Sequence, residues 1–146
     1  MTRHNARHAL VEAERPLGKP QERIPAAKVA TYPNEEQIQV AVAQYLDVKL
    51  PKSWLWYHCP NGGHRLKAVA AKLKAQGVKP GVPDCVILRP SGAPIYIELK
   101  AFGGTLSLAQ RMFMEHCIAA KVPYRVCRSV GEVELFLKEF IARDRA

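Results

Sequence analysis

Residues 83–100 read PDCVILRPSGAPIYIELK, and this stretch decides the fold. Two apolar runs, residues 84–88 and 95–99, flank a segment that contains two prolines, a serine and a glycine. Short apolar runs separated by turn-forming residues are typical of a β-hairpin. Because Val86, Ile87 and Leu88 are consecutive apolar residues, we expect both faces of these strands to be covered, which places the hairpin at the centre of a sheet.

The segments on either side of the hairpin alternate between helical and strand patterns. Before it, a helix capped by Asn34, with its apolar stripe at Ile38, Val42, Tyr45 and Leu46, precedes an aromatic strand over 54–59. A second helix over 65–76 follows, with its apolar face at Leu66, Val69, Ala70 and Leu73 and Gly77 as its C-cap. After the hairpin come a helix over 105–120, a strand over 123–127 and a helix over 129–142. This order predicts an α/β fold, a mixed β-sheet flanked by helices on both sides.

The length and composition are those of one globular domain. The chain has 146 residues, of which 48% are hydrophobic and 24% charged. A sequence of this size and composition has enough apolar surface for one hydrophobic core. Residues 1–30 contain three prolines and no sustained apolar period, so they are expected to be a flexible basic arm. We therefore assign the globular domain to residues 31–146.

No segment resembles a membrane span or a signal peptide. Pro, Gly or charged residues interrupt every apolar stretch well before the ~20 residues that a span requires. The expected location is the cytoplasm, where the four dispersed cysteines would be reduced thiols. His58, Cys59 and His64 suggest a zinc site, but adjacent side chains on a strand point to opposite faces, so we give this interpretation little weight.

The charge is strongly basic and concentrated in one part of the sequence. Lys and Arg number 22 against 13 for Asp and Glu, which gives a net charge of +9. Residues 48–83 contain no acid and seven basic residues: Lys49, Lys52, Arg65, Lys67, Lys72, Lys74 and Lys79. A focused positive charge indicates a polyanionic partner, either nucleic acid or an anionic membrane surface.

The hairpin carries a group of residues that suits phosphodiester chemistry. Glu98 and Lys100 are two apart on a strand and share a face. A five-residue loop over 90–94 would place Asp84 opposite Lys100 and diagonal to Glu98. Two neighbouring carboxylates repel each other unless a divalent cation such as Mg²⁺ lies between them. Such a cation polarises a phosphoryl oxygen and activates a water, while the lysine stabilises the developing charge.

The same three residues have a simpler structural interpretation. Asp84 after a proline is a common strand-entry residue, and Glu98 with Lys100 fits an exposed ion pair on an edge strand. A central position argues against this interpretation, because buried charges are costly unless a ligand or each other satisfies them. We therefore favour a functional site.

Five segments in order resemble the VRR-NUC domain, the virus-type replication-repair branch of the PD-(D/E)xK nucleases. They are residues 34–39 (NEEQIQ), 60–63 (PNGG), 77–84 (GVKPGVPD), 97–100 (IELK) and 106–110 (LSLAQ), and the resemblance covers roughly residues 32–137. It implies a restriction-endonuclease-like fold, dependence on Mg²⁺ or Mn²⁺, and cleavage of DNA. Stand-alone members of this size are similar to phage-type homodimers that act on branched DNA such as Holliday junctions, with roles in DNA repair.

The resemblance also implies roles for individual residues. Asp84 and Glu98 match the metal-binding carboxylates, Lys100 the catalytic lysine, and Glu35 the acid that completes the metal site. Gln110 matches a residue near the lysine. Two structural alternatives stay open: Glu35 suits the positive end of a helix dipole, and Ser107 with Gln110 fits a capping box.

The remaining candidates concern contact with DNA. Gln39 follows Glu35 by four residues and so shares its helical face. Asn61, Gly62 and Gly63 would let a DNA backbone approach closely, although a tight turn explains them equally well. The basic candidates are Arg65, Lys67, Lys72, Lys74 and Lys79.

Two other functions compete with a Mg²⁺-dependent DNA endonuclease. A non-catalytic nucleic-acid-binding module would be expected to have lost part of the site. Asp84, Glu98 and Lys100 are all intact, which argues against this function. A sequence-specific restriction-type endonuclease would be expected to carry an added recognition domain, and nothing in the sequence resembles one.

Overall fold

The computed structural model describes residues 31–60 and 67–145, and their elements follow the predicted order. They are α1 (Glu35–Lys49), β1 (Leu55–His58), α2 (Lys67–Ala75), β2 (Cys85–Leu88), β3 (Ile95–Leu99), α3 (Leu108–Ala119), β4 (Tyr124–Cys127) and α4 (Val130–Arg145). The predicted arm over 1–30 and the candidates Asn61, Gly62, Gly63 and Arg65 lie outside the described residues. No helix within the described residues is long and apolar enough to cross a membrane.

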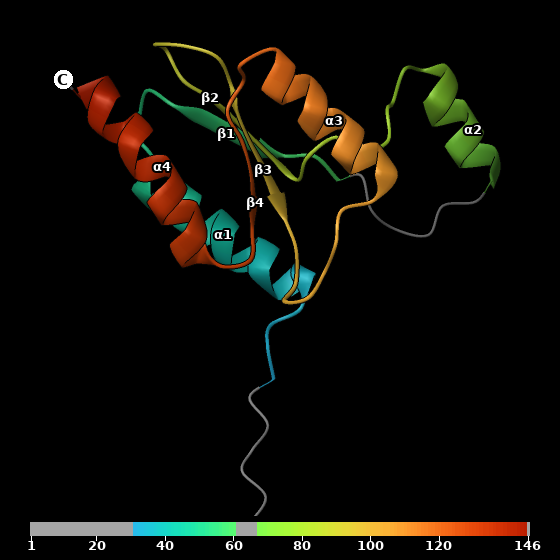
Figure 1. Ribbon diagram of the computed structural model, residues 1–146, viewed down its shortest axis with the longest axis horizontal. Coiled ribbons are helices and arrows are strands. Elements are labelled where there is room, and N and C mark those ends of the chain that lie inside the picture. The colour runs from blue at the N-terminus through green and yellow to red at the C-terminus, as the bar shows by residue number, and fades with distance from the viewer. Residues whose placement is uncertain (1–30, 61–66, 146) are drawn as a thin grey trace, which may run out of the picture. The chain divides into compact units, whose positions relative to one another are not determined.

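The four strands form one mixed sheet in the order β1-β2-β3-β4. β1, β2 and β3 are antiparallel neighbours, and β4 runs parallel to β3. The parallel pair is joined through α3, because a parallel connection has to cross from one end of the sheet to the other. Figure 1 shows α1 and α4 on one side of the strands and α3 on the other. The predicted α/β fold with a central hairpin is confirmed.

The two faces of the sheet are used differently. On the face toward α1 and α4, buried strand residues such as Ile87 and Ile97 pack against Leu46 of α1 and Leu137 of α4 in a single apolar core. The opposite face carries aromatic residues, where the Phe113 ring of α3 meets Tyr96 edge-on at 5.4 Å between ring centroids. Because side chains alternate along β3, Glu98 lies on this second face.

The first helix starts where the sequence predicts. The Asn34 side chain accepts a hydrogen bond from the Gln37 main-chain N–H at 2.8 Å, and the Gln37 side chain accepts one from the Asn34 N–H at 3.0 Å. This capping box satisfies otherwise unpaired donors at the helix start. Glu35 is therefore held in the first turn of α1.

The hairpin register differs from the prediction by two residues. Cys85 pairs with Ile97 and Ile87 with Ile95, so one further step places Asp84 opposite Glu98 and not opposite Lys100. The ladder stops early because the next partner, Pro94, has no N–H to donate. The Arg89 guanidinium turns toward α4 instead and pairs with Asp144 at 3.2 Å.

The second helix is less buried than its apolar pattern suggests. None of its residues is buried, and Val69 is 44% exposed. Figure 1 shows α2 beside α3 and away from the sheet, where a nine-residue helix has little to pack against. The predicted C-cap is confirmed: Gly77 has φ +93°, a conformation that glycine adopts without strain.

The remaining differences are small. The helix predicted over 105–120 begins later, because Ser107 is its N-cap. The last helix extends to Arg145. All four cysteines are free thiols, and three of them are buried: Cys85, Cys117 and Cys127.

Candidate functional site

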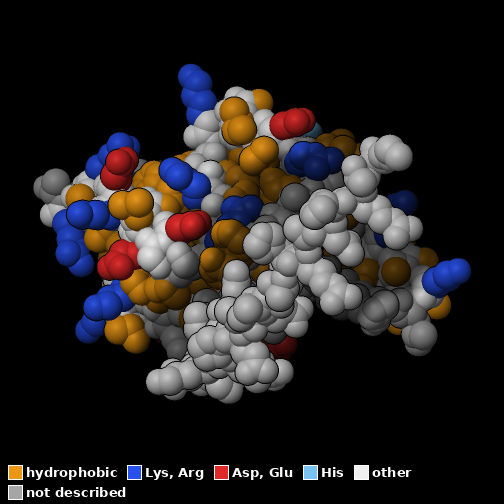
Figure 2. Space-filling view, turned by 60° about the horizontal axis from the view of Figure 1, so that its bottom comes forward, with side chains coloured by type: hydrophobic (Ala, Val, Ile, Leu, Met, Phe, Trp, Pro, Cys, Tyr) orange, Lys and Arg blue, Asp and Glu red, His pale blue; other side chains and the backbone are white. Residues whose placement is uncertain are grey.

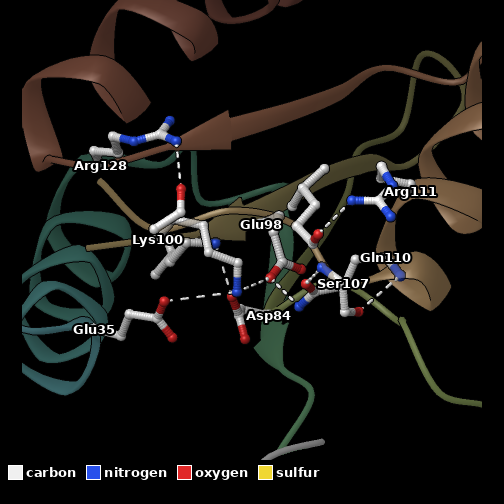
Figure 3. Close-up of polar contacts among 11 residues, drawn as sticks. Glu35, Asp84, Glu98, Lys100, Ser107, Gln110, Arg111 and Arg128 are labelled. Carbon is white, nitrogen blue, oxygen red and sulfur yellow. Dashed lines mark hydrogen bonds and ion pairs between the residues drawn. The ribbon is translucent and has the colours of Figure 1, made fainter. Parts of the chain in front are cut away.

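Five of the predicted site residues converge on one end of the hairpin. Figure 3 shows Glu35, Asp84, Glu98, Lys100 and Gln110 pointing toward one another. They come from the first turn of α1, the entry to β2, the end of β3 and the first turn of α3. The sheet face that lacks the main apolar core therefore holds a polar cluster at its edge.

Glu98 is the most deeply buried charged residue of this cluster. Its exposed fraction is 0%. One carboxylate oxygen, Oε1, lies 2.9 Å from Lys100 Nζ and accepts a hydrogen bond from Gln110 Nε2 at 2.5 Å. The other oxygen, Oε2, is buried and has no hydrogen-bond partner among the described residues. Burial raises the pKa of Glu98 to about 7, against the opposing effect of the Lys100 ammonium.

Asp84 is anchored to the same strand pair. Its Oδ2 atom accepts a hydrogen bond from the Leu99 main-chain N–H at 2.7 Å. His58 Nδ1 donates to the Asp84 main-chain carbonyl at 2.7 Å, which ties β1 to the entry of β2. Burial raises the pKa of Asp84, while the Leu99 hydrogen bond and the Lys100 charge act in the opposite direction.

Lys100 joins the two acids on either side of it. Its ammonium lies 2.9 Å from Glu98 Oε1 and 3.6 Å from Glu35 Oε1. Burial would lower the pKa of Lys100, but the hydrogen bond to Glu98 and the charges of the nearby acids outweigh burial and raise it. Glu35 itself is half in solvent, with 53% of its side chain exposed.

Gln110 makes the contacts of a capping box and also contacts the cluster. Its Oε1 atom accepts from the Ser107 main-chain N–H at 2.8 Å, and its main-chain N–H donates to Ser107 Oγ at 3.2 Å, which completes a capping box. The same amide group donates from Nε2 to Glu98. The start of α3 therefore fixes the orientation of the buried carboxylate.

The DNA-contact candidates are divided between the site and its surroundings. A cavity of about 560 Å³ is lined by Lys74 and Lys79 together with Asp84, Lys100 and Gln110. Lys67 and Lys72 lie exposed on α2. Gln39 is half-buried and donates from Nε2 to the Cys85 thiol at 3.6 Å, so its described contact is to β2 and not to a carboxylate.

The loop that forms one wall of the cavity was not among the predicted site residues. Val78, Pro80, Gly81 and Val82 line the cavity beside Lys79. Gly81 has φ +81°, and a Cβ there would overlap the main-chain carbonyl of Ala109. This close approach to α3 explains why the GVPD segment contains a glycine. The glycine was the signal in the sequence that could have pointed to this loop.

The donor atoms suit a hard divalent cation, although they are not arranged as a ready-made metal site. No group of three or more His, Cys, Asp and Glu side chains within 31–60 and 67–145 is positioned to hold a metal ion. The Lys100 ammonium lies between Glu35 and Glu98, where it supplies the positive charge. The unpartnered Glu98 Oε2 beside Asp84 is nevertheless the kind of oxygen ligand that Mg²⁺ prefers. We conclude that the residues fit such an ion.

The zinc interpretation finds no support in the part that the structure describes. His58 uses Nδ1 in the hydrogen bond to Asp84, and Cys59 is half-buried with a pKa raised by burial. His64 lies outside the described residues.

Comparisons with known proteins agree with the fold. The family model of the VRR-NUC domain matches residues 33–131. A solved structure described as a VRR_NUC domain protein is similar with a TM-score of 0.63 and 23% identity, covering 77% of this chain and 91% of that chain, which supports the fold. No curated protein matches the sequence. Since the family model covers well over half of the chain, the chain belongs to the VRR-NUC domain family, a nuclease family of the PD-(D/E)xK type.

Proposed function

We propose that the protein is a Mg²⁺-dependent endonuclease that hydrolyses DNA phosphodiesters at the Asp84–Glu98 site. The observation that carries this proposal is the fully buried Glu98 carboxylate, which has one oxygen paired with Lys100 and Gln110 and the other unpartnered. A fold retains such a group at a cost, because an unsatisfied buried oxygen destabilises the native state. Membership in a nuclease family supports this use of the site.

Asp84 and Glu98, with Glu35 from α1, would hold Mg²⁺, and Mn²⁺ would substitute for it. When bound, the ion supplies Lewis-acid polarisation of a phosphoryl oxygen and a water of lowered pKa. Gln110 orients the Glu98 carboxylate through its Nε2 hydrogen bond. Leu99 orients Asp84 through its main-chain N–H.

Lys100 acts as a cation and hydrogen-bond donor. The hydrogen bond to Glu98 and the charges of the nearby acids raise the pKa of Lys100, which favours the ammonium form. An ammonium group has three donors and no acceptor. It can hold a water molecule and stabilise the negative charge that develops on the phosphate in the transition state.

Basic side chains around the cavity would follow the DNA backbone. Lys74 and Lys79 line the cavity itself, and Lys67 and Lys72 extend the positive charge along α2. Figure 2 shows one face of the molecule, on which Lys and Arg side chains stand among hydrophobic ones. Gln39, Asn61, Gly62, Gly63 and Arg65 complete the proposed DNA-contact set.

The proposed substrate is branched DNA, such as a four-way junction, cut by a homodimer. One chain brings together one cluster of this kind within its described residues, whereas resolving a junction requires two cuts on symmetry-related strands. A two-fold pair of chains supplies both sites. The outer strand β1 exposes the side chains of Leu55 and Tyr57, which would offer apolar surface to a second copy.

The test is cleavage by the purified protein of supercoiled plasmid, linear duplex and a synthetic four-way junction, with Mg²⁺ or with EDTA. We expect cleavage with Mg²⁺ only, and a faster rate on the junction. DNA binding with no cleavage under any of these conditions would favour a non-catalytic binding module. Light scattering that shows a monomer, together with equal rates on linear and four-way DNA, would contradict the homodimer and the branched substrate.

A further inference from the structure

An exposed aromatic pair lies next to the site and outside the apolar core. The rings of Tyr32 and Phe102 are stacked, with centroids 4.2 Å apart and an angle of 15° between the ring planes. Tyr32 is 65% exposed and Phe102 is 66% exposed. Stacked aromatic rings that remain this exposed leave apolar faces in water, which is typical of a recognition surface.

The sequence and the contacts both place this pair at the cluster. Tyr32 precedes Glu35 by three residues, and Phe102 follows Lys100 by two. Because consecutive Cα atoms are about 3.8 Å apart, the Cα of Phe102 lies within about 8 Å of the Lys100 Cα. A Cβ built on Gly104 would be 3.6 Å from Glu35 Oε1, so the loop that carries Phe102 packs against α1.

A hydrogen bond from the end of β4 holds the loop that carries Phe102. Arg128, just after β4, donates from its guanidinium to the Gly104 carbonyl at 2.9 Å, as Figure 3 shows. Arg128 also donates its main-chain N–H to Glu132 in α4 at 2.8 Å. The ring of Phe102 is therefore presented by a fixed loop, which lowers the entropy that binding would cost.

We propose that Tyr32 and Phe102 form a stacking platform for an unpaired nucleobase of the DNA strand that is cut. This inference rests on the proposed nuclease function and names the feature of the substrate that is selected. A nucleobase offers a flat π-face of matching size, and stacking on an aromatic side chain tolerates any base. Bases within a duplex are already stacked on their neighbours, so the platform would engage a base that is unpaired or unstacked at the branch point beside the scissile phosphate.

The test uses forked oligonucleotides that carry 2-aminopurine at successive unpaired positions, because the fluorescence of this base falls when it stacks. Measurements in EDTA separate binding from cleavage. Phe102→Leu and Tyr32→Leu keep apolar side chains and remove the π-faces, and Phe102→Trp keeps the π-face. Leu135→Ala is the matched control, since Leu135 is an exposed apolar residue of α4.

We expect the wild type, Phe102→Trp and Leu135→Ala to quench 2-aminopurine at one or two adjacent positions. The combined Tyr32→Leu and Phe102→Leu variant should lose this quenching and bind forked DNA about tenfold more weakly, with unchanged binding to duplex. Unchanged quenching in the combined variant would overturn the platform. Equal weakening on forked and duplex DNA, or a lower melting temperature as the sole effect, would instead make the pair a structural clasp.

Cleavage of plasmid with Mg²⁺ separates this proposal from the proposed function. If the protein cleaves no DNA but the quenching of 2-aminopurine depends on Tyr32 and Phe102, the platform is supported and the nuclease function is rejected. If the protein cleaves DNA but the quenching is the same in the wild type and in both variants, the platform alone is rejected.

Discussion

Glu98 is a carboxylate without exposed surface, and its surroundings explain how the fold tolerates it. Lys100 and Gln110 satisfy one oxygen, while the other is buried without a partner among the described residues. Removing one partner of a buried ion pair is usually more harmful than removing both, because the remaining charge is left unpaired. A proton or a divalent cation at Glu98 relieves that cost.

Replacement of Lys100 by Ala should stop the chemistry and spare DNA binding. The loss of a cation that stabilises the transition state costs about 10²–10³ in rate. Binding rests on phosphate contacts elsewhere, so the affinity for DNA measured by fluorescence anisotropy should stay near that of the wild type. Lys138→Ala on α4 is the control for loss of a positive charge. Cleavage by Lys100→Ala at nearly the wild-type rate would rule out the proposed role.

The stability of the metal-free protein should depend on pH through Glu98. Its pKa is about 7 in the folded state, raised from 4.5. The folded state therefore binds this proton more tightly, and the resulting stability is fully present below about pH 4.5 and is lost as the pH rises through 7. We expect the free energy of unfolding in EDTA to fall by up to about 3 kcal/mol over this range.

Denaturant titrations of the wild type and of Glu98→Gln at several pH values would measure this effect. The neutral amide removes the ionisation and should flatten the profile, although Asp84, with its pKa also raised, leaves a smaller slope of the same sign. Adding Mg²⁺ should reduce the loss at high pH. An identical pH profile for both proteins would contradict a raised pKa at Glu98.

Strand alternation was sufficient to predict that Glu98 and Lys100 share a face, because the period of two is the same in every strand. The residue opposite Asp84 on the neighbouring strand was not predictable in this way. The register of the hairpin depends on where the hydrogen-bond ladder between β2 and β3 ends. This ladder ends at Ile87 and Ile95, because Pro94 has no N–H to donate and Arg89 pairs with Asp144. A tertiary ion pair of this kind leaves no local pattern in the sequence.

Among the connecting segments, the one between α2 and β2 contributes most to the site. It lines the cavity with Lys79 and Gly81 and leads directly into Asp84. Gly81 lies against the first turn of α3, where a Cβ would come within 2.8 Å of the Gln110 main-chain nitrogen. The capping box of α3 and the entry of β2 are therefore coupled through a single glycine.

Substitution of Gly81 by Ala should both destabilise the fold and impair cleavage. A non-glycine residue at φ +81° costs about 1–2 kcal/mol, and the overlap with the Ala109 carbonyl adds to this. The shift of Gln110 away from Glu98 should lower the cleavage rate as well. Gly77→Ala is the matched control, since Gly77 has φ +93° with nothing within 4 Å of a Cβ. Equal melting temperatures and equal rates for the two variants would show that the close approach is unimportant.

The basic residues of α2 should contribute to DNA affinity without regard to sequence. Replacing Lys67 and Lys74 together by Gln removes two charges from a helix with no acid in its first turn. Binding should weaken equally for all sequences, and the slope of log K against log salt should decrease by about one for each phosphate that the variant no longer neutralises. Lys121→Gln with Lys138→Gln is the control for charge alone. An unchanged slope in the α2 variant would move the DNA-binding surface elsewhere.

The N-caps of α1 and α3 were predictable, whereas the burial of α2 was not. A glutamine follows Asn34 by three residues, and another follows Ser107 by the same spacing. Both pairs form the capping boxes that this spacing indicates. Periodicity showed that α2 has an apolar face, but not what would cover it. The burial of this face depends on the length of the helix and on the segments around it, which lie far away in the sequence.

At the scale of the whole domain, the two faces of the sheet carry different kinds of residues. The face toward α1 and α4 carries the apolar core, and the face toward α3 carries the polar cluster at one edge. From α1, the first turn reaches the cluster, through Glu35. The order of elements was enough to predict this α/β architecture, because few arrangements connect such an order without crossing. The side-chain contacts at the site required the structure.

Asp84 and Glu98 are proposed to hold the divalent cation that is used to cut DNA. The most direct test of this assignment is titration with Mn²⁺, followed by electron paramagnetic resonance, for the wild type and for Asp84→Asn. The amide oxygen of Asn can still accept the Leu99 hydrogen bond, so the fold should persist while the negative charge is removed. We expect Mn²⁺ to bind to the wild type and not to Asp84→Asn, with cleavage abolished in parallel. Equal Mn²⁺ affinity of the two proteins would contradict the assignment of the site.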